Sequence, residues 1–206
     1  MLQWVCFSIA KGHKALRLEK REITENIIEI WKKTGKVSVL KSSGRCMIPL
    51  FDDGTPLIVR HVQPDEIKIG DIAVFRCSDR TVAHRIIGRY KEDEKLYFLE
   101  KRDSGFEPSI IPEDAIIGKV IGFQRGDRSI NIEKGIWRLT NRLVGYYWLF
   151  SYSLYKGVRK FKVKIFKEKR VTLASKVYSI VSSLLVHAAH SFISLIHRLS
   201  LPKNKP

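Results

Sequence analysis

The sequence has little of what a disulfide-stabilised or zinc-bound fold requires. It contains three cysteines, Cys6, Cys46 and Cys77, an odd number with no C-x-x-C pair. This excludes a regular disulfide framework and favours a reducing compartment. A metal site built from Cys46, His61, Cys77 and His84 would have ligand separations of 15, 16 and 7 residues, which match no compact finger pattern. We therefore expect no metal and no cofactor.

Acidic residues are scarce towards the C-terminus. Residues 131–206 hold 15 Lys and Arg but only two acids, whereas the first 130 residues are nearly balanced. A strongly basic segment attached to a nearly neutral body indicates an anionic partner. Residues 177–196 contain no Asp, Glu, Lys or Arg, and serines and histidines gather on one side of a helix predicted over residues 172–199. We interpret this helix as lying at a membrane interface, with a spanning helix at 177–196 or a helix packed on the protein as alternatives.

Composition and periodicity divide the chain into three segments. Residues 1–35 lack the order of a secretory signal, because apolar residues precede the charged ones, and they contain a predicted helix at Thr24–Lys33 that ends before Gly35. Residues 36–130 show short, frequently interrupted apolar runs, which predict a mainly β fold: a compact, partly closed antiparallel domain. Residues 131–206 are predicted to form a basic, amphipathic helical tail. The predicted strands are Val37–Val39, Met47–Phe51, Leu57–Val59, Ile72–Phe75, Thr81–Ile87, Tyr97–Leu99 and Ile116–Phe123.

Three chemically capable side chains follow one another along the predicted β domain. Cys46 lies between the flexible Gly44 turn and an apolar run, His84 lies inside an apolar strand, and Asp103 follows the end of a strand. Thiol, imidazole and carboxylate are the components of a nucleophilic relay. Taken singly, each has a plainer interpretation: an inert small residue, a core histidine and a surface turn acid.

Five ordered blocks resemble the signal peptidase I and LexA-type (S24/S26) peptidases. In the first, Gly44-x-Cys46-Met47-x-Pro49 is similar to the motif that carries the family's nucleophilic serine, with cysteine in its place. Thr55 stands where the family has Asp after Gly, and His84 corresponds to the general base of the archaeal and endoplasmic-reticulum type. The similarity covers about residues 24–124. The blocks are Gly44–Val59, Gly70–Phe75, Val82–Ile87, Phe98–Asp103 and Ile116–Gly122.

The resemblance implies peptide-bond hydrolysis with Cys46 as nucleophile, His84 as base and Asp103 as the residue that orients the imidazole. A thiol has a reference pKa of about 8.5 and ionises more readily than a hydroxyl, and a neighbouring imidazolium lowers its pKa further. The backbone N–H of Cys46 and a hydroxyl of Ser43 or Ser42 would bind the oxyanion. The implied oxyanion and substrate-binding positions are Ser43, Gly44, Met47 and Pro49.

We therefore expect a signal-peptidase-like endopeptidase that removes a leader or signal segment from a peptide or protein substrate. Residues 131–206 would hold it peripherally on the anionic cytoplasmic face of a membrane. A catalytically inactive, peptide-binding homologue and a LexA-like regulator associated with nucleic acid are the alternatives. No convincing helix-turn-helix precedes residue 36, and the basic tail has few features of base readout, so nucleic acid is the least favoured partner.

Overall fold

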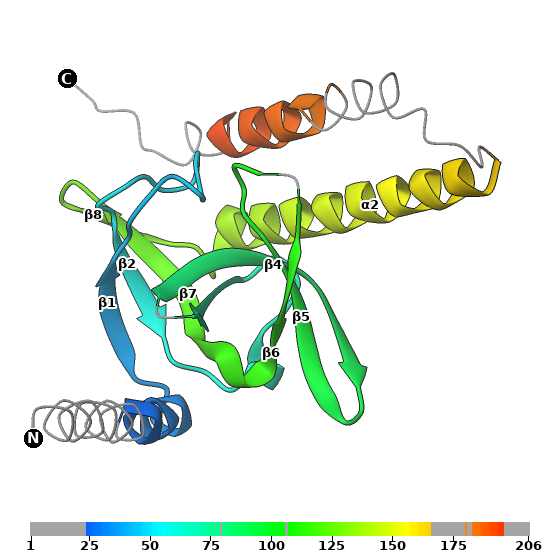
Figure 1. Cartoon of the computed structure of the whole chain (residues 1–206). Coiled ribbons are helices and arrows are strands. Elements are labelled where there is room, and N and C mark those ends of the chain that lie inside the picture. Colours follow the sequence, from blue (N-terminus) through cyan, green and yellow to red (C-terminus); the bar gives the residue numbers. More distant parts are fainter. Residues whose placement is uncertain (1–23, 79, 106, 166–179, 181–182, 196–206) are drawn as a thin grey trace, which may run out of the picture.

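A curled, half-barrel sheet of eight antiparallel strands forms the body of the protein, with a short N-terminal helix and C-terminal helices around it (Figure 1). The computed structural model describes residues 24–78, 80–105, 107–165, 180 and 183–195, and only the backbone of 158–165. The prediction of a mainly β fold is confirmed. The elements are β1 (Val37–Lys41), β2 (Pro56–Arg60), η1 (Pro64–Glu66), β3 (Ile72–Cys77), β4 (Arg80–Glu92), β5 (Lys95–Lys101), β6 (Ser109–Pro112), η2 (Glu113–Ala115), β7 (Ile116–Arg125), β8 (Arg128–Asn131) and α2 (Gly135–Ile165), and residues 24–34 and 183–195 are also helical.

The strands are hydrogen-bonded in the order β1-β2-β7-β3-β4-β5-β6, and β8 pairs with β7. Six of the seven predicted strands lie inside observed ones. The prediction of a strand at Met47–Phe51 is wrong: the segment turns, and the N–H groups of Leu50 and Phe51 both donate to the Met47 carbonyl, at 2.9 and 3.4 Å. Strands β6 and β8 were not predicted.

The N-terminal helix ends as its sequence indicates. Gly35 has a φ of +62°, the left-handed conformation that favours glycine after a helix. The N–H of Lys36 donates to the Trp31 carbonyl at 3.0 Å, which closes the last turn. Trp31 also packs edge-on against the ring of His61, with 4.9 Å between centroids, so this helix is attached where β2 ends.

Strand β3 lies at the centre of the sheet and is buried on both faces. Ile72 and Val74 join the larger core cluster, and Ala73 and Phe75 join a second one on the other face. This explains why the sequence there is a continuous apolar run rather than an alternating one.

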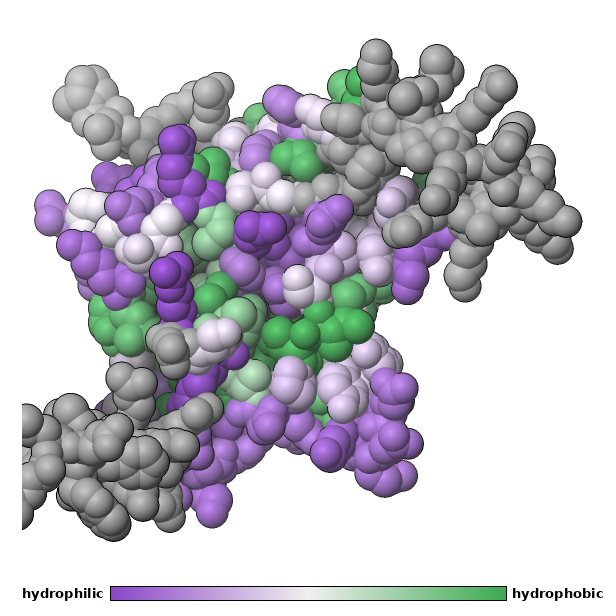
Figure 2. All heavy atoms as spheres, viewed as in Figure 1, coloured by the Kyte–Doolittle hydropathy of each residue, from purple (hydrophilic) through white to green (hydrophobic). Residues whose placement is uncertain are grey.

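The C-terminal helices pack on the sheet instead of standing apart from it. Trp137, Val144 and Trp148 of α2, together with Ala189 and Ile193, belong to the larger core cluster. Figure 1 shows α2 and the later helix on the same side of the sheet. On the face drawn in Figure 2, hydrophilic side chains alternate with smaller apolar patches.

Within the described part of the chain, no helix has the length and apolar character needed to cross a membrane. The predicted helix at residues 172–199 is helical over its described portion, residues 180 and 183–195. Residues 177–179, 181–182 and 196, which belong to the alternative spanning segment, lie outside the described residues.

A glycine–glycine contact brings α2 close to the turn before β3. A Cβ atom on Gly145 would lie 2.7 Å from the N and Cα of Gly70, and one on Gly70 would lie 2.5 Å from the Asn141 carbonyl oxygen. Gly70 also has a φ of +94°. Both positions therefore require glycine for the helix to approach this closely.

Candidate active site

A thiol, an imidazole and a carboxylate come together from the turn after β1 and from strands β4 and β5. Cys46, half-buried in the turn after β1, lies close enough to His84 of β4 for each side chain to shift the pKa of the other. The Nδ1 atom of His84 lies 2.7 Å from Oε2 of Glu100 on β5, which leaves Nε2 for the thiol. Cys46 and His84, which the sequence pairs, therefore lie together, and the carboxylate beside the imidazole is that of Glu100.

The electrostatics of these three groups favour a thiolate–imidazolium pair. The hydrogen bond from His84 lowers the pKa of the Cys46 thiol against the opposing effect of burial. Burial alone lowers the pKa of His84, but the hydrogen bonds to Cys46 and Glu100 outweigh it and raise the pKa to about 9. The edge of the Phe75 ring also packs against the imidazole, with 5.8 Å between centroids. An ion pair of this kind is a competent nucleophile near neutral pH.

Asp103 does not orient His84, so that expectation is wrong. Arg85 binds both oxygens of Asp103, from Nε to Oδ1 at 2.8 Å and from Nη2 to Oδ2 at 2.7 Å. The reason is strand alternation: the pairing of Arg85 with Lys101 places Glu100 on the His84 face, and Asp103 on the opposite one with Arg85. The same alternation could have identified Glu100 in the sequence, had the register of β4 and β5 been known.

The Arg85–Asp103 pair is a buried clamp between elements. Both side chains are at most 1% exposed. Nη1 of Arg85 also donates to the Gly70 carbonyl at 3.1 Å and to Oδ1 of Asn141 at 2.9 Å. One guanidinium therefore ties β4 to the end of β5, to the turn before β3 and to α2.

Backbone contacts on both sides fix the loop that carries Cys46. The N–H of Gly44 donates to Oδ1 of Asp53 at 2.8 Å, and the N–H of Ser104 donates to the Cys46 carbonyl at 3.0 Å. Ser104 directly follows Asp103 of the buried clamp. Cys46 is thus positioned by the loop after β5 as well as by its own turn.

The model of the family described as Peptidase S24-like matches residues 4–121, more than half of the chain. The match includes the turn with Cys46 and the strands with His84 and Glu100. The chain belongs to this peptidase family. The resemblance of the five blocks is thereby confirmed at the level of the family. A search among curated proteins gives no match.

In this member of the S24-like family, the positions expected at the oxyanion and substrate site differ in their surroundings. Ser43 and Gly44, which precede Cys46, are exposed, and Pro49 is partly buried. Met47 is 1% exposed and packs in the larger core cluster, so its side chain anchors the turn to the core. The Ser42 hydroxyl donates to a backbone carbonyl at 2.6 Å and is already engaged.

The other residues considered as metal ligands have separate surroundings in the S24-like domain. The ring of His61 lies 3.0 Å from the Ser38 hydroxyl and 3.2 Å from the Ile117 carbonyl oxygen. Cys77 is exposed at the end of β3. Among the described residues, no group of three His, Cys, Asp or Glu side chains could hold a metal ion.

Proposed function

We propose that this S24-like peptidase is a cysteine endopeptidase that cleaves a leader or signal segment from a substrate at a membrane surface. The observation that carries the proposal is the series Cys46–His84–Glu100, in which a half-buried thiol contacts an imidazole held by a buried carboxylate. The family assignment supports peptide-bond hydrolysis in general.

The chemistry follows from the three groups. The Cys46 thiolate attacks the carbonyl carbon of the scissile bond, and the backbone N–H of Cys46 faces the oxyanion that forms. The His84 imidazolium gives its Nε2 proton to the leaving amine, which leaves a thioester on Cys46. His84 then takes a proton from the water that hydrolyses the thioester, and the acid is released. Glu100 fixes the tautomer and stabilises the imidazolium in both steps.

The edge of β1 fits an extended peptide. Among the described strands, β1 pairs only with β2 and so ends the hydrogen-bonded sheet. Its side chains Val37 and Val39 are 49% and 60% exposed. A peptide added along this edge would run towards Cys46, five residues after the strand ends at Lys41. Strand addition of this kind gives backbone hydrogen bonds regardless of sequence, and side-chain pockets give specificity.

The outer face of α2 supports association with anionic lipid on the cytoplasmic side of a membrane. An apolar stripe follows the helix at spacings of three and four residues, with side chains 48% to 68% exposed. On the helical wheel, Arg138, Arg142 and Lys156 border this stripe on one side. An apolar stripe with a basic border is the pattern of a helix at a lipid interface. The stripe consists of Ile136, Leu139, Leu143, Tyr146, Phe150 and Leu154.

The peptidase proposal is tested with a leader-bearing peptide and the purified full chain. We expect cleavage by the wild type and loss of cleavage in Cys46→Ala and His84→Ala. Equal cleavage by the wild type and Cys46→Ala would remove the assignment. Cleavage by Cys46→Ser alone would mark the natural protein as an inactive, peptide-binding member of the family.

The lipid proposal is tested separately by flotation with vesicles that contain phosphatidylserine or only phosphatidylcholine. We expect binding to the anionic vesicles and at least a threefold loss in Leu143→Ser/Phe150→Ser. The matched control is Ile110→Ser, an exposed apolar side chain of β6 (57% exposed). If the control loses as much binding as the double variant, α2 is not the lipid-binding face.

A further inference from the structure

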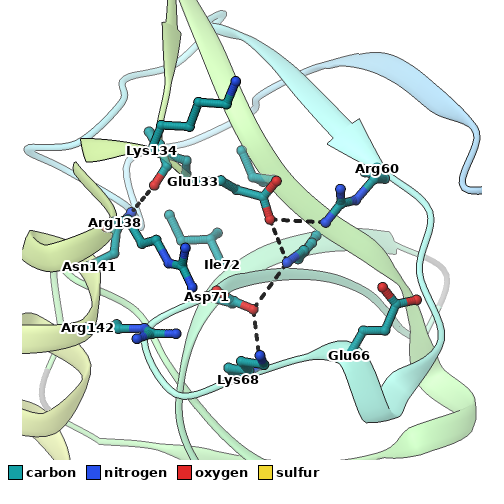
Figure 3. A pocket seen from close by; sticks show the side chains of 13 residues that line it. Arg60, Glu66, Lys68, Asp71, Ile72, Glu133, Lys134, Arg138, Asn141 and Arg142 are labelled. Atoms are coloured by element: carbon teal, nitrogen blue, oxygen red, sulfur yellow. Dashed lines mark hydrogen bonds and ion pairs between the residues drawn. The ribbon is translucent and has the colours of Figure 1, made fainter. Parts of the chain in front are cut away.

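A polar pocket of about 450 Å³ lies where the turn before β3, strand β7 and the first turns of α2 meet. Figure 3 shows its lining side chains, which come from segments far apart in the sequence. None of Cys46, His84 and Glu100 lines it. It is therefore separate from the candidate active site.

Positive charge dominates the lining of this pocket. Six cationic side chains face three acidic ones, Glu66, Asp71 and Glu133. One of the cations, Lys119, is only 8% exposed, which is unusual for lysine. The six cations are Arg60, Lys68, Lys119, Lys134, Arg138 and Arg142.

Two of the acids are already paired with the two innermost cations. Glu133 binds Nη2 of Arg60 at 3.2 Å and Nζ of Lys119 at 2.5 Å. Asp71 lies 3.6 Å from the same Lys119 and accepts the backbone N–H of Lys68 at 3.0 Å. The third acid, Glu66, accepts the Gln63 N–H and closes its own turn. The acids thus neutralise the pocket floor and leave its wall on α2 positive.

Arg138 and Arg142 form that wall, about one helical turn apart. Both side chains extend from α2 into the pocket, towards Asp71 and Lys68 (Figure 3). Within the described residues, no acid lies within ion-pair distance of either guanidinium. Neighbouring like charges repel one another, and an anion placed between them removes this cost.

We propose that this pocket binds a phosphate monoester or a pyrophosphate group. Guanidinium groups match phosphate oxygens through paired, charge-assisted hydrogen bonds, and two arginines on one helix face offer two such forks. Lys68 adds a point charge from the opposite wall. The volume lies in the range of sites that hold small ligands.

The phosphate can belong to a soluble ligand or to a lipid headgroup, and the experiment separates the two. Pyrophosphate and glycerol 3-phosphate are titrated into the full chain by calorimetry at physiological salt, and vesicles with phosphatidic acid are compared with vesicles with phosphatidylserine by flotation. The test variant is Arg138→Gln/Arg142→Gln. The control is Lys91→Gln/Lys95→Gln, which removes the same charge from the exposed β4–β5 hairpin.

We expect saturable binding of at least one phosphate probe at one site per chain. Loss of two charge-assisted contacts should weaken this binding roughly tenfold or more in the Arg138/Arg142 variant and leave the control within about twofold. Binding of the soluble probes assigns the site to a soluble ligand. Since Arg138 and Arg142 also border the apolar stripe of α2, the site is assigned to a headgroup only by a preference for phosphatidic acid over phosphatidylserine that the Arg138/Arg142 variant loses. The proposal is overturned if no probe binds, or if both variants lose affinity equally. Cleavage of the leader peptide reports on the active site independently of either outcome.

Discussion

Replacement of Glu100 by Gln separates its effect on His84 from its contribution to packing. The Nδ1···Oε2 contact is 2.7 Å, and the side chains of His84 and Glu100 are only 11% and 10% exposed. Hydrogen bonds to charged groups contribute about 1.5–3 kcal/mol, and one pKa unit corresponds to about 1.4 kcal/mol. Removal of the negative charge should therefore lower the pKa of His84 by about 1–2 units from about 9.

The assay is the pH profile of kcat/KM with the leader peptide. The reactive pair needs imidazolium, so its alkaline limb follows the pKa of His84, about 9 in the wild type. In Glu100→Gln the limb should move down to about pH 7–8, and kcat/KM at pH 8 should fall by about two- to tenfold as the imidazolium population drops.

Glu92→Gln is the matched control, because it removes the same charge from an exposed position near the end of β4. Its profile should coincide with that of the wild type. The reasoning is refuted if Glu100→Gln keeps the alkaline limb of the wild type, or if its limb moves upwards. Either result would mean that Glu100 does not set the charge state of the imidazole.

Three further predictions test the surroundings of the site. In a background without the other two cysteines, iodoacetamide should alkylate Cys46 with a midpoint pH below that of an ordinary thiol, and His84→Ala should raise the midpoint, since the His84 hydrogen bond lowers the thiol pKa. Asp103→Asn should lower the free energy of unfolding in urea by about 3–5 kcal/mol without moving the alkaline limb, because it breaks a buried ion pair outside the dyad. Gly145→Ala should cost about 1–3 kcal/mol in thermal unfolding through overpacking. The control for this variant is Gly157→Ala, where a Cβ atom would meet open space; it should be neutral or stabilising by up to about 1 kcal/mol.

Block order and apolar patterning predict much of this fold. The pairing of Cys46 with His84 follows from two blocks whose order matches the family, even though 38 positions separate them. The wrong strand prediction at Met47–Phe51 shows what apolar patterning cannot give: a run of apolar residues indicates that the segment is buried, but it does not determine the backbone conformation. Met47 and Leu50 are both 1% exposed, yet the chain turns between them.

Strands β6 and β8, which the sequence did not predict, lack the apolar pattern that buried residues give to a strand. Strand β8, Arg128–Asn131, has no buried residue, and β6, Ser109–Pro112, has one and lies at the edge of the sheet. Edge strands tolerate proline and polar residues because one side of the ladder is unpaired. The basic pocket was equally hidden in the sequence, since its cations lie on β2, β7, α2 and two connections, and only the folded chain brings them together.

The alternation of side chains along β5 also decides whether Lys101, rather than His84, could act as the base for Cys46. Burial lowers the pKa of Lys101 to about 7, a value suited to proton transfer. However, Lys101 pairs with Arg85, so its side chain lies on the face opposite His84. Its Nζ sits 3.3 Å from the centroid of the Trp148 ring and donates to the carbonyls of Arg102 and Gly105. A lysine held by an aromatic face and two carbonyls supports the fold, whereas only the imidazole contacts the thiol. The alternation of side chains that places Glu100 beside His84 therefore also places Lys101 on the other face of the strand, away from His84.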